Sequence, residues 1–314
     1  MKLIFYYDIE GAGNPYFKYI YNTIFEQFKY KYPDYTVVHE QPDYEKLGNS
    51  FSSPGGKSNL QIINPLNNNI ILMSFWDRGM DLLTEKGIGW EKYNLVQYIG
   101  GLGMRLNSQQ IKEKYGVTHL PFQYPLGVPN SYEYVDEFYK PFNPDEKIKK
   151  AVFIGAIYGT RAEICYRMKN HPLIDIFDNT AGYIGREYFK KLSEYLISIS
   201  FNGNGELCLR DFESMGLNIP VVRPGLLTEL HNPLIPDYHY IKATEPCENA
   251  HFSHRNTNIN DLSNQYINSI ETSINDYDKL LKITNNAHEY FESYCKPDYI
   301  IDLFFKLLNI KLII

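Results

Sequence analysis

One stretch of the chain, residues 195–225, constrains the fold more than any other. It opens with an apolar run at 196–201, which predicts a buried strand, and continues into a polar turn of Asn and Gly at 202–205. An amphipathic helix is predicted at 206–216, and a second buried strand begins at Pro220. Asn and Gly tolerate positive φ, and the free N–H groups of a helix N-terminus attract anions. The stretch therefore predicts a strand–turn–helix–strand unit that binds an anion, such as a diphosphate, at its turn.

Short apolar runs and amphipathic patterns alternate in both halves of the chain. Strands are predicted at 2–7, 36–39, 60–63, 70–75, 93–99, 151–157, 174–177 and 238–242, and helices at 15–30, 108–114, 162–169, 187–192 and 261–283. Residues 64–69 are predicted to form a hairpin turn. Alternating strands and helices favour parallel sheets, so the fold class is α/β with two Rossmann-like domains. The domains are predicted at 1–145 and 146–296, followed by a terminal helix at 297–314.

Composition limits the classes of partner and the compartment. With 314 residues, 44% of them hydrophobic and 22% charged, the chain is long enough for two globular domains. A net charge of −6 and the lack of a basic run argue against nucleic acid as a partner. The four cysteines are far apart, which favours reduced thiols in a cytoplasmic protein, and no signal peptide or membrane span is expected. The apolar tail at 299–314 is predicted to pack on the protein body, and the alternative is peripheral contact with a membrane.

The segment from Glu213 to Val222, E-S-M-G-L-N-I-P-V-V, resembles the E-A-L-A-C-G-x-P-V-V segment of GT-B glycosyltransferases. The resemblance implies a GT-B fold, in which two Rossmann-like domains face a cleft and a C-terminal helix crosses back to the N-terminal domain. It also implies that Glu213 binds the ribose hydroxyls of a nucleotide-sugar. Two positions depart from the family pattern. Asn218 replaces the usual Gly, and Gly205 stands where retaining members carry an acidic residue, with Glu206 one step away.

A second segment, residues 234–241, is similar to the L-x-P-x-x-H-Y-I-P-V segment of the CAP10-like protein O-glucosyltransferases. Those enzymes are inverting GT-B transferases with a catalytic Asp at the end of an N-terminal-domain strand. The similarity implies Asp77, at the end of an apolar run, as the general base that takes a proton from the acceptor hydroxyl. Asp8, which follows the first predicted strand, is the rival for this role.

Candidate ligands of the donor follow from strand ends, because open α/β sheets bind ligands beyond the carboxyl ends of their strands. Arg161 follows a strand at a helix N-terminus, where it can offset diphosphate charge, and the alternative is an ion pair with Glu163. Arg210 competes for this role, since a cation near a helix N-terminus calls for an anionic partner, and Asp211 is the alternative partner. The predicted donor-binding residues are Gly155, Arg161, Asn202, Gly203, Gly205, Arg210 and Glu213.

These features together predict a glycosyltransferase of the hexosyltransferase type, which moves a sugar from a nucleotide-diphosphate sugar to a glycan or other hydroxyl acceptor. No D-x-D stands at a predicted strand end, so the expected mechanism uses no metal and no cofactor besides the donor substrate. Two alternatives remain open. A nucleotide-sugar epimerase would turn over the donor without an acceptor, and a non-catalytic sugar-binding protein would bind the donor without turnover.

Overall fold

The computed structural model describes residues 2–6, 15–40, 59–67, 69–74, 95–98, 108–116, 118–119, 130–178, 182–202, 206–226, 230–246 and 258–308. The chain divides into two compact units. The first comprises Met1–Gly127, Thr228–Asn232 and Cys295–Ile314, and the second comprises Val128–Leu227 and Pro233–Tyr294. Residues 128–145, which the predicted domain boundary assigned to the N-terminal half, therefore lie in the second unit.

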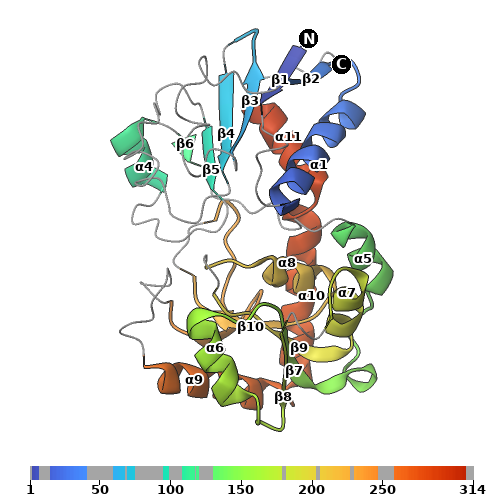
Figure 1. The fold of residues 1–314 in the computed structure, drawn as a ribbon, viewed down its shortest axis with the longest axis vertical. Coiled ribbons are helices and arrows are strands. Elements are labelled where there is room, and N and C mark those ends of the chain that lie inside the picture. The colour runs from blue at the N-terminus through green and yellow to red at the C-terminus, as the bar shows by residue number, and fades with distance from the viewer. Residues whose placement is uncertain are drawn as a thin grey trace. The chain divides into compact units, whose positions relative to one another are not determined.

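The first unit is built on a six-stranded mixed sheet with the order β2-β1-β3-β4-β5-β6 (Figure 1). Its strands are β1 (Lys2–Tyr6), β2 (Thr36–Glu40), β3 (Asn59–Asn64), β4 (Asn69–Ser74), β5 (Leu95–Tyr98) and β6 (Thr118–His119). β3 runs antiparallel to both of its neighbours, so the expectation of a parallel sheet is wrong for this unit. The predicted hairpin turn, which pairs Asn64 with Asn69, makes β4 antiparallel to β3, and β3 also pairs antiparallel with β1.

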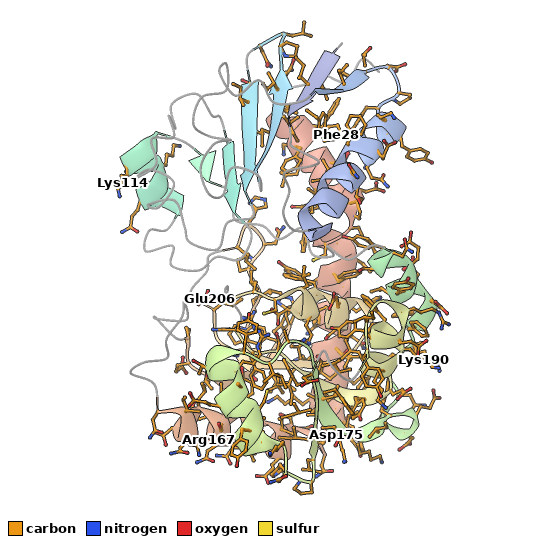
Figure 2. The ribbon with its side chains drawn as sticks, in the orientation of Figure 1. Phe28, Lys114, Arg167, Asp175, Lys190 and Glu206 are labelled. Carbon is orange, nitrogen blue, oxygen red and sulfur yellow. The ribbon has the colours of Figure 1, made fainter. Side chains whose placement is uncertain are left out.

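Helices α1 (Pro15–Lys31) and α11 (Pro297–Leu307) supply the core of the first unit, and α4 (Ser108–Tyr115) packs against β6. α1 begins at a proline, whose fixed φ suits the first position of a helix. Phe28 of α1 packs against Phe5 of β1 and Phe305 of α11 in one buried cluster (Figure 2). Tyr32 stacks on Phe305 with the ring centroids 3.7 Å apart. The C-terminal helix is therefore part of the hydrophobic core of this unit.

The second unit contains a five-stranded parallel sheet with the order β11-β10-β9-β7-β8, as predicted for this half. Its strands are β7 (Ile148–Ile154), β8 (Ile174–Phe177), β9 (Tyr195–Ile199), β10 (Val221–Pro224) and β11 (Ile241–Thr244). Counted along this unit, the strand order is 2-1-3-4-5, a doubly-wound arrangement. The chain leaves β7 toward β8 and returns on the other side at β9. The switch point of the topology therefore lies between β7 and β9.

Helices cover both faces of the second sheet. They are α5 (Ser131–Phe138), α6 (Gly159–Met168), α7 (Arg186–Ser193), α8 (Leu209–Gly216), α9 (Ile259–Ser273) and α10 (Tyr277–Tyr294), with a 3-10 turn at Pro144–Glu146. α6 and α9 pack together on one side of the sheet, and α7 and α8 lie on the other (Figure 1). The predicted helix at 261–283 is thus two helices. Among the described residues, no helix is long and apolar enough to cross a membrane.

Candidate functional site

The β7–β9 switch point brings two loops together at the carboxyl edge of the second sheet. The loop after β7 leads into α6, and the loop after β9 leads into α8. Both helices therefore begin at this edge, where their first N–H groups lack partners within the helix. α8 begins at Leu209, three residues later than predicted, because Cys208 is its N-cap and Asp211 accepts the Cys208 N–H at 2.7 Å. Asn202 and the starts of the two helices thus lie at the edge where doubly-wound folds bind ligands.

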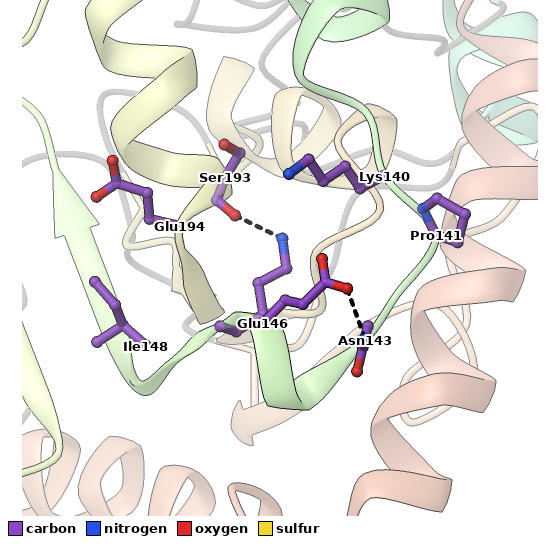
Figure 3. A pocket seen from close by; sticks show the side chains of 8 residues that line it. Lys140, Pro141, Asn143, Glu146, Ile148, Ser193 and Glu194 are labelled. Carbon is purple, nitrogen blue, oxygen red and sulfur yellow. Dashed lines mark hydrogen bonds between the residues drawn. The ribbon is translucent and has the colours of Figure 1, made fainter.

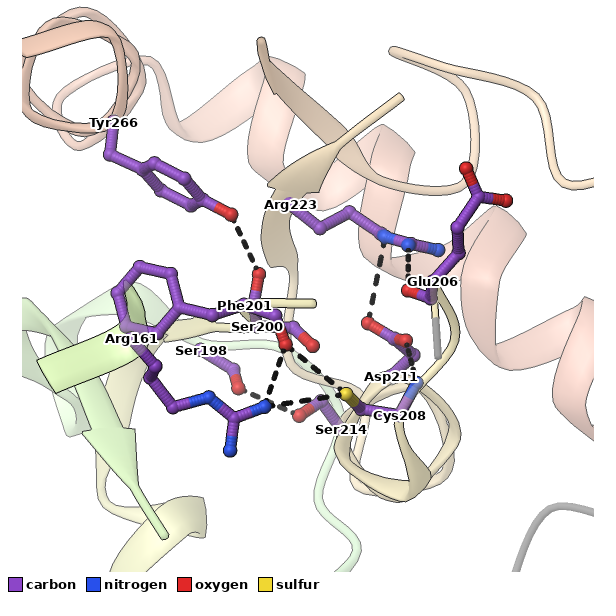
Figure 4. Close-up of polar contacts among 10 residues, drawn as sticks. All are labelled: Arg161, Ser198, Ser200, Phe201, Glu206, Cys208, Asp211, Ser214, Arg223 and Tyr266. Atoms are coloured by element: carbon purple, nitrogen blue, oxygen red, sulfur yellow. Dashed lines mark hydrogen bonds and ion pairs between the residues drawn. The ribbon is translucent and has the colours of Figure 1, made fainter. Parts of the chain in front are cut away.

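Arg161 joins the ends of the two central strands. Its Nη1 donates to the carbonyl of Ala156 at 3.0 Å, and its Nη2 donates to the carbonyl of Phe201 at 3.1 Å (Figure 4). The side chain is buried, with 8% of the residue surface exposed, and no described carboxylate lies within 4.0 Å of its guanidinium. Its Nε has no hydrogen-bond partner among the described residues. Within the described part of the chain, Arg161 therefore does not form the ion pair with Glu163 that the sequence left open as an alternative.

Arg210 approaches the same point from α8. Its Nη2 donates to the carbonyl of Ile154, the last residue of β7, and its Nε lacks a partner within the described part of the chain. The residue is 9% exposed, and its guanidinium lies 4.4 Å from the Phe153 ring centroid. Gly155 makes room for this side chain, because a Cβ at that position would overlap the Nη2 of Arg210. Arg161 lies over the same Phe153 ring at 5.5 Å, so two guanidinium groups share one aromatic platform.

Asn202 and Glu213 complete the described part of the predicted donor site. Asn202 follows β9, and both polar atoms of its amide are buried with no partner among the described residues. Glu213 of α8 is 4% exposed, and its Oε2 accepts the hydroxyl of Tyr188 at 2.6 Å. Burial raises the pKa of the Glu213 carboxyl, while the Tyr188 hydrogen bond and the charge of Arg210 oppose that increase.

Four predicted site residues lie outside the described residues. They are the two candidate bases, Asp77 and Asp8, and the turn glycines Gly203 and Gly205. Their roles stay predictions.

Asp211 and Arg223 form an ion pair at this edge of the sheet that the sequence analysis did not predict. Asp211, proposed as the partner of Arg210, instead forms an ion pair with Arg223 of β10, with 3.7 Å between Oδ1 and Nε. Both side chains are almost fully buried, at 0% and 1% exposure. A charged residue inside an apolar strand is the signal that could have identified the pair, since buried charges need partners. The sequence alone does not say which acidic residue is the partner of Arg223.

A separate cavity of about 320 Å³ lies at the amino edge of the same sheet, next to the start of β7 (Figure 3). Lys147 donates from this cavity to the Ser193 carbonyl at 2.5 Å, and Glu146 accepts from Asn143 at 2.8 Å. Burial and the nearby charge of Lys140 lower the pKa of Lys147. Doubly-wound sheets bind ligands at the opposite, carboxyl edge, so this cavity does not belong to the switch-point site.

Comparison with known proteins finds similarity to solved structures, of which three are described here. No protein family and no curated protein matches the sequence. A structure of a point mutant of S. aureus TarM, in complex with fondaparinux, alpha-GlcNAc-glycerol and UDP, matches 73% of this chain and 47% of its own length, at 14% identity and a TM-score of 0.44. The pneumococcal O-GlcNAc transferase GtfA, in complex with UDP and GlcNAc, matches 70% of this chain and 45% of its own, at 11% identity and a TM-score of 0.41. A second TarM structure matches 92% of this chain and 58% of its own, at 13% identity and a TM-score of 0.46. The chain spans about half the length of the solved structures it matches.

Proposed function

We propose that this chain is a glycosyltransferase that binds a nucleotide-diphosphate sugar at the β7–β9 switch point and transfers the sugar to an acceptor hydroxyl. One observation carries the proposal. Arg161 and Arg210 bring two buried guanidinium groups to the Phe153 ring, and no described carboxylate lies within ion-pair distance of either. Two buried guanidinium groups at one ring make this place positively charged, and a bound diphosphate would complement both charges.

The neighbouring groups suit the rest of such a donor. α6 and α8 both begin at this edge, and helix N-termini favour anions. The amide of Asn202, which has no partner among the described residues, can accept and donate hydrogen bonds. In this proposal Glu213 binds the ribose hydroxyls, as the GT-B resemblance implies. The diphosphate charge is then met by arginine and helix N-termini without a divalent ion.

The diphosphate assignment is tested by calorimetric binding of UDP, GDP and dTDP, each beside its nucleoside. We expect Arg161→Ala or Arg210→Ala to weaken diphosphate binding by about 1.5–3 kcal/mol, the scale of a charge-assisted hydrogen bond, and to leave nucleoside binding nearly unchanged. Arg167→Ala is the matched control, because Arg167 is exposed in the last turn of the same α6. Equal losses for nucleoside and diphosphate would point to a disturbed fold. A requirement for magnesium or manganese after EDTA treatment would contradict the metal-independent form of the proposal.

The acceptor base is tested separately from the donor site. We assign the proton transfer to Asp77, with Asp8 as the rival. Asp77→Asn keeps the shape of the side chain and removes its basicity, so we expect donor affinity within about twofold of wild type and transfer reduced by roughly 10²–10⁴. Asp8→Asn is the parallel control, and only one of the two variants is expected to behave in this way. Near wild-type transfer by Asp77→Asn would pass the assignment to Asp8 or to a retaining mechanism.

A further inference from the structure

The Arg223–Asp211 ion pair lies directly beside the segment that leads from the polar turn into α8 (Figure 4). Arg223 Nη2 donates to the carbonyl of Glu206 at 2.7 Å. Asp211 Oδ2 accepts the N–H of Cys208 at 2.7 Å. The pair therefore holds the main chain on both sides of Leu207. Arg223 of β10 thus holds the main chain just before α8, and its partner Asp211 of α8 holds the N-cap residue.

The geometry of the Arg223–Asp211 ion pair is poorly suited to stabilising the folded state. Arg223 Nε and Nη1, Asp211 Oδ1 and the Tyr240 hydroxyl are buried and have no hydrogen-bond partner among the described residues. Taking two charges out of water is costly, and apolar residues of similar volume often stabilise a core as well or better. The two hydrogen bonds to main-chain atoms are what an apolar pair could not supply. The arrangement therefore favours a role in fixing the backbone over a role in adding stability.

We propose that Arg223 and Asp211 are positioning residues, which fix the backbone at 206–209 so that the N-terminus of α8 and Arg210 face the anionic group of the ligand. The inference rests on the proposed diphosphate site for its consequence in binding. Its structural part, the fixing of residues 206–209, stands independently. Arg210 follows this segment directly, so a shift of the segment moves the guanidinium away from the switch point.

The test compares three variants of the full chain. Asp211→Leu/Arg223→Met removes both charges of the pair, so neither partner is left without the other, and Arg223→Lys keeps the charge but cannot reproduce the forked contacts of Arg. Ser214→Ala is the matched control, because it removes a buried 2.8 Å hydrogen bond between Ser214 of α8 and Ser198 of β9, away from the turn. Each variant is measured for melting temperature, for amide exchange of the peptide that contains Cys208, and for affinity to UDP.

We expect the double variant to melt near the wild-type temperature, to exchange the Cys208 amide about tenfold faster, and to bind UDP about tenfold more weakly. Arg223→Lys should also speed amide exchange at Cys208 and weaken UDP binding. If the double variant does not fold, this single variant tests the positioning role. Ser214→Ala should lower the melting temperature and leave both other readouts unchanged. Wild-type exchange at Cys208 in both Arg223 variants would overturn the inference. If wild-type protein binds no nucleoside diphosphate, the proposed function fails, while the exchange result still decides whether the pair fixes the segment.

Discussion

At the scale of single residues, burial and one tyrosine hydroxyl act in opposite directions on Glu213. Burial raises the pKa of this carboxyl above its ordinary value of 4.5, so the group favours the folded state at low pH and loses that contribution as the pH rises through the raised pKa. The Tyr188 hydroxyl donates to the carboxylate and opposes the increase. We therefore expect Tyr188→Phe to cost about 1.5–3 kcal/mol of unfolding free energy at pH 8 and less near pH 5, where more of the carboxyl is protonated.

Urea unfolding of both proteins at the two pH values measures this difference. The control is the same change in a Glu213→Gln background, where residue 213 carries no charge at either pH. There the cost of Tyr188→Phe should be the same at pH 5 and pH 8. A cost independent of pH in the wild-type background as well would mean that Glu213 does not titrate as its burial implies.

Single residues were predictable where a local pattern marks them. Arg161 and Arg210 were chosen because they follow strand ends at helix starts, and the structure brings both to the Phe153 ring. Arg223 interrupts an otherwise apolar strand, but nothing in the local sequence identifies its partner. Its partner Asp211 lies twelve positions away on another element, and only the packing of α8 on β10 brings them together. Local pattern therefore finds a charge near a strand end more readily than a pair across elements.

At the scale of elements, most of the predicted strands and the helices predicted at 15–30, 108–114 and 187–192 agree with the structure within two residues at each end. The β3–β4 hairpin was recognisable from its Asn-rich turn, but the antiparallel direction of β3 in the sheet depends on pairing with β1, which no local pattern encodes. Apolar periodicity runs through 261–283 without a gap, yet the structure contains two helices. Asp276 supplies the break, because its Oδ1 accepts the Lys279 N–H at 3.1 Å and begins α10.

The end of α11 shows how an element far along the chain is held by an earlier one. The Leu308 carbonyl, at the C-cap of α11, accepts the side-chain amides of Asn64, Asn67 and Asn69 at 3.3, 3.1 and 3.1 Å. The last carbonyls of a helix have no partner within it, and here the hairpin turn between β3 and β4 supplies three donors. The same asparagines that mark the turn in the sequence thus fix the C-terminus of a helix whose cap lies 239 residues after Asn69.

At the scale of the whole molecule, the described residues include a hydrophobic core in each of the two units. One is formed by β1, β3, β4, α1 and α11, and the other by β7–β11, α6, α9 and α10. Chains with separate cores often unfold in more than one step. Both tryptophans of the sequence, Trp76 and Trp90, fall in the stretch of chain assigned to the first unit, so we choose tryptophan fluorescence as the probe of that unit. Far-UV circular dichroism follows both.

The asparagine cap tests whether each core sets its own transition. Asn64→Ala/Asn67→Ala/Asn69→Ala leaves the buried Leu308 carbonyl without these donors, which should cost about 1–3 kcal/mol. The single change Asn67→Ala leaves two donors for the two lone pairs of that carbonyl and should cost much less. In urea, the triple variant should shift the fluorescence midpoint and leave the second circular dichroism transition in place. Ser214→Ala should do the reverse, since Ser214 lies in the second unit. A single transition that moves as a whole in both variants would show that the two cores unfold together, because then loss of either set of contacts would destabilise one cooperative structure.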